Sequence, residues 1–143
     1  MKNKISCIAI FLLTAWSVSA QDVEKSYDLN QMGALKLAEQ AKIEARKSDK
    51  NVSVAVLNSS GVIILLLKGD NVGPHNTEAS RRKAYTALST KTPSFDLMQK
   101  AAADSTAKNL NTLPELLLLG GGVPIWKDGE LVGSLGVSGA GGG

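Results

Sequence analysis

The sequence has 143 residues, a length sufficient for one domain. Its hydrophobic fraction of 43% is ordinary for a globular protein. The formal charge is +3, but Lys2 and Lys4 lie in a segment that we expect to be removed, and the other 14 basic residues face 13 acidic ones. The remaining balance of +1 excludes the strongly basic character that binding to nucleic acid or to a membrane surface requires.

Residues 1–20 have the pattern of a secretory signal peptide. A short basic start precedes an apolar run from Ile5 to Val18, and the small residue Ala20 matches a cleavage site. The apolar run is shorter than the roughly 20 residues of a membrane-spanning helix, although an uncleaved anchor is the alternative. The only cysteine, Cys7, lies in this segment. We therefore expect a periplasmic or secreted protein without disulfides, in which residues 21–143 form a single domain.

Capping and periodicity predict a helix and then a hairpin. Asn30 can cap a helix that runs to about Arg46 and carries its small and apolar residues on one face. The stretch Val52–Leu57 alternates branched apolar and small residues, as a half-buried strand does. A turn is predicted at Asn58–Gly61 and a second strand at Val62–Leu67. Because the second strand is apolar on both faces, we expect helices or another subunit to cover both.

A further helix is predicted over Thr77–Leu88, after a Gly-Pro turn. Four of its residues share one stripe at helical spacing, and three of these are small, which lets a helix backbone approach a sheet closely. They are Ser80, Ala84, Ala87 and Leu88. Arg81 and Lys83 flank this stripe, where a cation can meet an anionic ligand or a carboxylate. Arg82 points to the opposite side and is predicted to be a solvated surface charge.

The last part of the chain predicts one more helix and a second hairpin. Ser94 is expected to cap a helix from Phe95 to about Ala103. The Asp-Gly pair at 128–129 is a strong signal for a two-residue turn, which would join the strands Val123–Lys127 and Leu131–Ser138. Paired strands with helices between the pairs predict an α+β fold, in which helices pack on an antiparallel sheet of two hairpins with about four to five strands.

Few residues indicate chemistry. A single histidine, His75, and no cysteine in the mature chain exclude a zinc site of the usual kind. No G-x-S-x-G motif is present, so nothing supports a serine–histidine–acid triad. His75 precedes the helix of Arg81 and Lys83; imidazole can bind haem iron axially, and cations can pair with its propionates. The glycine run 120–122 indicates either a chain reversal, which we favour, or a wall whose N–H groups face an anionic ligand.

Three stretches carry a resemblance: V-A-V-L-N-S-S-G after a helix, the helix A-S-R-R-K-A-Y-T-A-L, and L-P-E-L-L-L-L-G-G-G-V-P-I-W-K-D-G-E-L-V-G-S-L-G-V-S-G-A. Over about Leu29–Gly139 the chain resembles the GlcG/HbpS family, also described as haem-binding or haem-degrading. The resemblance implies an α+β fold, self-association into dimers or larger rings, and a binding protein more securely than an enzyme. It places the family's helix on Arg81, Arg82 and Lys83 and its glycine turn on residues 120–122. Members continue past the glycine tail, so we expect this chain to lack their closing helix.

Together, motifs and resemblance favour an exported homo-oligomer that binds haem or a related tetrapyrrole. Two alternatives stay open: an enzyme or accessory protein for a small hydroxy or keto acid of glycolate-type metabolism, and a sensor-partner module without a ligand. His75 is the candidate axial ligand of haem iron. The candidate ligand-binding residues are His75, Arg81, Lys83, Tyr85, Gly120, Gly121 and Gly122.

Overall fold

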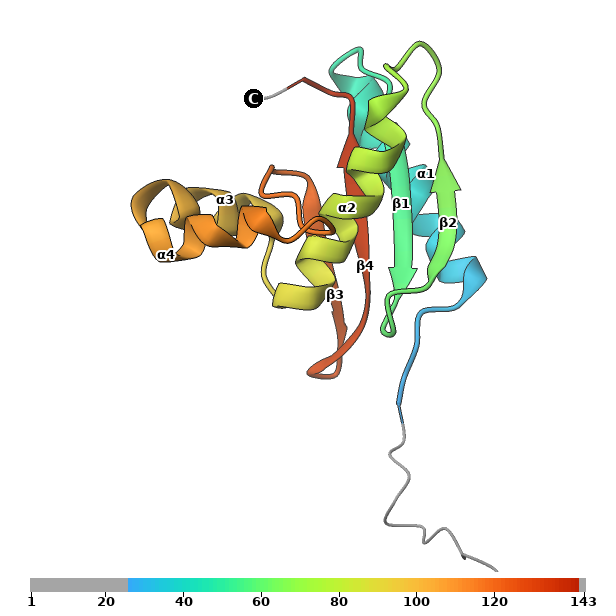
Figure 1. Ribbon diagram of the computed structural model, residues 1–143. Coiled ribbons are helices and arrows are strands. Elements are labelled where there is room, and N and C mark those ends of the chain that lie inside the picture. The colour runs from blue at the N-terminus through green and yellow to red at the C-terminus, as the bar shows by residue number, and fades with distance from the viewer. Residues whose placement is uncertain (1–25, 142–143) are drawn as a thin grey trace, which may run out of the picture.

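A computed structural model describes residues 26–141, and the predicted signal peptide lies outside them. Figure 1 shows the chain in this range. In chain order the elements are α1 (Gln31–Lys47), β1 (Ser53–Asn58), β2 (Ile63–Leu67), α2 (His75–Thr90), α3 (Ser94–Ala103), α4 (Ser105–Lys108), the 3-10 helix η2 (Asn109–Thr112), β3 (Gly122–Lys127) and β4 (Glu130–Ser138). None of the helices in this range is long and apolar enough to cross a membrane.

The four strands form one open antiparallel sheet in the order β2-β1-β4-β3. Each predicted hairpin is present, and the two hairpins join through the pairing of β1 with β4. Asp128 (φ 52°) and Gly129 (φ 82°) both have the left-handed conformation that a two-residue turn of type I′ requires. The predicted α+β fold with an antiparallel sheet of two hairpins is therefore confirmed, with four strands.

A helix covers each face of the sheet. On one face, Ala34 and Ala38 of α1 pack against the valines of β1. On the other face, Ala84 and Leu88 of α2 pack against Ala55 and Leu57 of β1. The helix α3 and the short α4 lie to one side, near the β3 end (Figure 1). The side chain of Asn30 accepts a hydrogen bond from the backbone N–H of Gly33 (2.9 Å), which confirms the predicted cap of α1.

The helix α2 lies unusually close to the sheet. All four residues of the predicted stripe are buried, as expected: Ser80, Ala84, Ala87 and Leu88. A Cβ atom at Gly136 of β4 would collide with the carbonyl oxygen of Ser80 and would lie 2.6 Å from the backbone nitrogen of Ala84. A Cβ at Gly122 of β3 would collide in the same way with the carbonyl oxygen of Lys83. The small-residue stripe and these two glycines therefore set the distance between helix and sheet.

The edge strand β2 has less helical cover than its sequence suggested. Ile63, Leu66 and Leu67 are 44%, 39% and 36% exposed. The reason is that α2 packs mainly over β4, β1 and β3, whereas α1 lies over the other face of β1 and β2. The helices within residues 26–141 do not cover both faces of β2, and cover by another subunit stays a prediction.

The close approach of α2 predicts that Gly136→Ala lowers the free energy of unfolding by about 3 kcal/mol, because the added methyl group meets rigid backbone. Urea denaturation followed by circular dichroism measures this change. Gly33→Ala is the matched control: the atom nearest to its Cβ is the flexible end of Leu29 at 2.9 Å, and alanine favours a helix. A control as unstable as Gly136→Ala would contradict the explanation.

Candidate functional site

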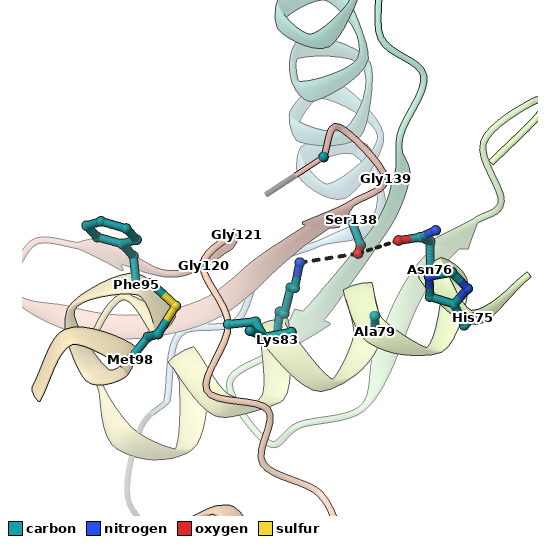
Figure 2. A pocket seen from close by; sticks show the side chains of 12 residues that line it. His75, Asn76, Ala79, Lys83, Phe95, Met98, Gly120, Gly121, Ser138 and Gly139 are labelled. Carbon is teal, nitrogen blue, oxygen red and sulfur yellow. Dashed lines mark hydrogen bonds between the residues drawn. The ribbon is translucent and has the colours of Figure 1, made fainter. Parts of the chain in front are cut away.

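A cavity of about 850 Å³ lies beside α2, within the range of roughly 300–1,000 Å³ that is usual for small-molecule sites. Four segments surround it: the start of α2, the start of α3, the glycine run before β3 and the end of β4 (Figure 2). The lining residues are His75, Asn76, Ala79, Lys83, Phe95, Met98, Leu119, Gly120, Gly121, Ser138, Gly139 and Gly141.

The lining divides into an apolar side and a polar side. Figure 2 shows Phe95 and Met98 of α3 on one side of Lys83, and Asn76 and His75 on the other. Phe95 is 44% exposed although it borders the cavity, so part of the apolar side faces solvent. A ligand with an apolar body and one anionic end would match both sides of this cavity.

Lys83 is the central polar group. The residue is only 9% exposed, and its Nζ donates to Ser138 Oγ (3.2 Å) and weakly to the Val137 carbonyl oxygen (3.4 Å). Ser138 Oγ in turn donates to Asn76 Oδ1 (2.8 Å). No carboxylate of the described residues lies within 4.0 Å of Nζ, and burial lowers the pKa of Lys83. An anionic ligand group would therefore supply the missing counter-charge.

The glycine run satisfies a steric requirement and also borders the cavity. Gly121 has φ 120°, and a Cβ there would collide with the Val137 carbonyl oxygen and lie 3.4 Å from Lys83 Cδ. Gly122 has no room for a side chain because of the Lys83 carbonyl. Gly120 and Gly121 line the cavity, whereas Gly122 begins β3. Thus the conformational interpretation is supported, and the same glycines bring the chain close to Lys83.

Ser94 holds this run in place. Its Oγ donates to the Leu119 carbonyl oxygen (2.7 Å) and accepts from the Gly122 N–H (2.8 Å). The prediction that Ser94 caps α3 is wrong: Ser94 is the first helical residue, and Pro93 occupies the cap position without a side-chain bond. The hydroxyl is fully buried, so it binds the two backbone groups that need partners there.

Arg82 also has a structural role, and the prediction that it is a solvated charge is wrong. Its Nη2 donates to the Leu116 carbonyl oxygen (2.6 Å), 34 residues away. Four residues further along α2, Thr86 Oγ1 accepts from the Leu117 N–H (2.8 Å). These two side chains attach the segment before the glycine run to α2. The backbone of that segment is not part of the sheet, so its polar groups need side-chain partners.

The structure brings four of the seven predicted ligand-binding residues to the cavity: His75, Lys83, Gly120 and Gly121. Arg81 lies outside the lining, paired with Glu78 (2.6 Å) and Glu115 (2.8 Å), and the hydrogen bonds that it donates to Glu78 raise its pKa. Tyr85 packs against two apolar clusters instead. Within residues 26–141, no three His, Cys, Asp or Glu side chains come together as a metal site.

The sequence interpretation missed six side chains that line the cavity: Asn76, Ala79, Phe95, Met98, Leu119 and Ser138. Phe95 and Met98 stand three residues apart on α3 and so share a face, a signal that periodicity could have given. Ser138 and Asn76 are 62 residues apart and meet only because β4 ends beside the start of α2. No local pattern indicates that contact.

The desolvated ammonium predicts a pH-dependent effect of Lys83→Met. Burial makes the folded chain hold this proton less tightly than the unfolded chain, whose lysine has a pKa near 10.5, so the wild type gains stability as the pH rises toward 10.5. The variant lacks this gain, and its stability relative to the wild type should fall between pH 7 and pH 10.5. Urea denaturation at several pH values measures the difference. Lys36→Met, an exposed control on α1, should show no such trend; a flat difference for Lys83→Met would contradict desolvation.

Comparison with known proteins identifies relatives in sequence. A family model described as "Haem degrading protein HbpS-like" matches residues 29–143. The protein GlcG of Escherichia coli strain K12 is 32% identical over 110 residues, which cover 77% of this chain and 81% of GlcG. The match therefore spans nearly all of the domain described above.

Solved structures agree with this result. The crystal structure of HbpS is 34% identical and superposes with a TM-score of 0.78 over 86% of this chain and 85% of that chain. A double mutant of HbpS from Streptomyces reticuli, also 34% identical, gives 0.79 over 87% and 83%. The PduOC:heme complex, 24% identical, gives 0.66 over 78% and 83% and shows likeness of fold alone. The chain belongs to the HbpS-like family.

Proposed function

We propose that this protein is exported and binds haem or a related tetrapyrrole in the cavity beside α2, as part of a homo-oligomer. The observation that carries the proposal is the Lys83 ammonium: it is desolvated, lacks a carboxylate partner among the described residues, and faces a cavity with an apolar side. Such a site suits an acidic ligand with a large apolar body.

The residues fit the parts of a haem. Lys83 would hold a propionate, because its ammonium bonds only to neutral groups and pairs with no carboxylate of the described residues. Phe95, Met98 and Leu119 would contact the ring. His75 is exposed at the start of α2, and its imidazole forms no hydrogen bond or ion pair with the described residues, so it is free to act as an axial ligand. Bound haem would supply the iron chemistry; the chain's own contribution is to hold and orient it.

The family and the exposed strand support the other parts of the proposal. The matching family is described as haem-degrading, and PduOC, a protein of the same fold, is known as a haem complex. The signal-peptide pattern of residues 1–20 supports export. The exposed apolar residues of β2, an edge strand, support association with another subunit.

A second candidate is binding or conversion of a small hydroxy or keto acid, whose carboxylate Lys83 would hold. The same ammonium, which pairs with no carboxylate of the described residues, favours it. Arg81, the other predicted holder of this carboxylate, already pairs with two glutamates. A small acid would leave most of the cavity of about 850 Å³ and its apolar side without a contact, so the tetrapyrrole is the better match.

A hemin titration of the mature protein, followed by absorbance, tests the proposal. We expect a Soret band that saturates at one hemin per subunit. Lys83→Met should raise the dissociation constant by about 10-fold to 100-fold, the equivalent of losing one hydrogen bond to a charged group. His75→Ala should shift the band if the imidazole binds iron.

Arg81→Ala is the matched control, since this cation of the same helix lies outside the cavity lining. Its hemin affinity should equal that of the wild type. Absorbance that never saturates, or equal losses in Lys83→Met and Arg81→Ala, would reject the proposed site. Turnover of a small hydroxy or keto acid without hemin affinity would favour the second candidate.

A further inference from the structure

A second, smaller cavity of about 230 Å³ lies where the end of α1 meets the start of β1 and the end of β2. Its lining residues are Lys42, Arg46, Lys50, Asn51, Val52, Leu67, Lys68, Gly69 and Asp70. Four of these nine are cations and one is a carboxylate, and none of them lines the larger cavity. The smaller cavity is therefore a separate site with a strong excess of positive charge.

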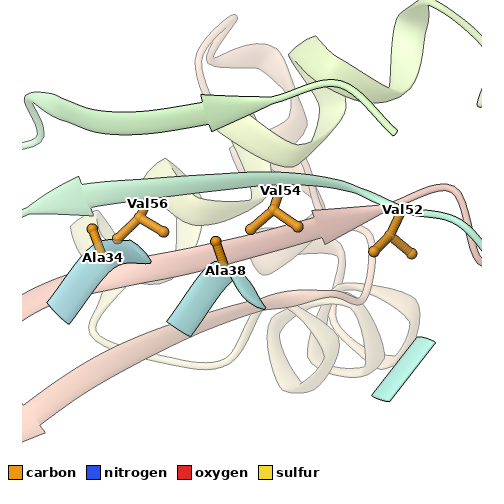
Figure 3. Packing of buried hydrophobic residues seen from close by; sticks show 5 residues of the cluster. All are labelled: Ala34, Ala38, Val52, Val54 and Val56. Atoms are coloured by element: carbon orange, nitrogen blue, oxygen red, sulfur yellow. The ribbon is translucent and has the colours of Figure 1, made fainter. Parts of the chain in front are cut away.

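Packing of α1 fixes one side of this basic cavity. Figure 3 shows Ala34 and Ala38 of α1 directed at Val54 and Val56 of β1, with Val52 just before the start of this strand. Val52 is buried and also lines the basic cavity. The helix therefore cannot slide along the strand without breaking this apolar contact, and its last turns stay beside the start of β1.

The end of α1 positions three of the cations. Lys42 and Arg46 stand four residues apart and so share a helix face. Beyond the helix, the Asp49 N–H donates to the Arg46 carbonyl oxygen and the Lys50 N–H to that of Ala45, both at 3.0 Å, and Asp49 has φ 54°. These two bonds with a left-handed residue form a Schellman motif. The motif holds the backbone of Lys50 against the last turn of α1. Lys50 therefore stays close to Arg46, on the same side of the cavity.

The opposite side comes from the end of β2. Gly69 donates its N–H to Ser53 Oγ (3.1 Å), and a Cβ there would lie 2.6 Å from the Val52 carbonyl oxygen. The chain therefore passes very close to β1 at this point, which places Lys68 and Asp70 across the cavity from α1. Among the described residues, Lys68 Nζ bonds only to the adjacent Gly69 carbonyl oxygen (3.0 Å).

The charges of this cavity are poorly compensated. Lys42 pairs with Glu39 (3.2 Å), but no carboxylate of the described residues lies within 4.0 Å of Arg46, Lys50 or Lys68. The helix dipole favours a cation in the last turn of α1, which accounts for Arg46. It does not account for Lys50 and Lys68, which come from other segments into the same cavity. Like charges gathered in this way repel each other unless an anion lies between them.

We propose that the basic cavity binds a small dianion of the phosphate type, either inorganic phosphate or a phosphate monoester. Its volume suits one tetrahedral group and is too small for a tetrapyrrole. Arg46 offers the planar fork that pairs with two oxygens of one phosphate, and Lys50 and Lys68 add two point charges. The proposal concerns a different site from the haem proposal and does not depend on it.

Isothermal titration and thermal denaturation of the mature protein test this site, with sodium phosphate, sodium sulfate and glycerol phosphate each added at constant ionic strength against chloride. We expect saturable binding of one phosphate per subunit and a rise in melting temperature of several degrees at saturation. Tighter binding of glycerol phosphate than of inorganic phosphate would indicate a monoester as the ligand, and the reverse order the free ion.

The double variant Arg46→Gln with Lys50→Gln should lose at least 10-fold in phosphate affinity. Lys36→Gln with Lys47→Gln, which makes the same change of charge on α1 outside the cavity, should retain wild-type affinity. Lys68→Gln, on the opposite side, gives an independent check if the double variant is unstable. A response that does not saturate, or equal losses in both double variants, would overturn the proposal. Hemin affinity should be the same in all of these variants.

Discussion

The close approach of α2 to the sheet is the constraint on which the rest of the structure depends. Gly136 and Gly122 leave no room for side chains between the strands and the backbone of α2 at Ser80 and Lys83. Since the backbone of Lys83 lies against the sheet, its side chain extends along the sheet to Ser138 rather than into solvent. The distance between helix and sheet thus determines the burial of Lys83, and burial in turn makes its ammonium dependent on a partner.

The same helix uses its other polar residues for attachment. The segment before β3 runs outside the sheet, so its backbone groups need side-chain partners, which α2 supplies through Arg82 and Thr86 and α3 through Ser94. Two consecutive arginines therefore have different structural roles, Arg82 with a backbone carbonyl and Arg81 with two carboxylates. Of the three adjacent cations, Lys83 alone borders the larger cavity.

Local signals were sufficient to predict most of the fold. A capping Asn30, the Asp-Gly turn at 128–129 and the small-residue stripe of α2 each act within a few residues of the chain, and each is present in the structure. The errors fall on Ser94 and Arg82, whose partners lie 25 and 34 residues away and leave no trace in local periodicity. The part of the cavity lining that lies on α2 and the glycine run was predictable from local sequence. The apolar side of the cavity was missed because it depends on where α3 packs.

Position and partners together separate the structural cations of α2 from the candidate binding group. Arg81 has two carboxylate partners and Arg82 donates to a backbone carbonyl, and neither residue lines the larger cavity. Lys83 has neutral partners only and is buried beside the apolar side of the cavity, a setting that would suit the proposed ligand with one anionic end and a large apolar body. Arg46, Lys50 and Lys68 are exposed and line a small cavity, which would suit the proposed compact anion of higher charge. Because the two proposed ligands are opposite in size and charge density, a ligand suited to one cavity would be a poor ligand for the other, and the two proposals can be tested independently.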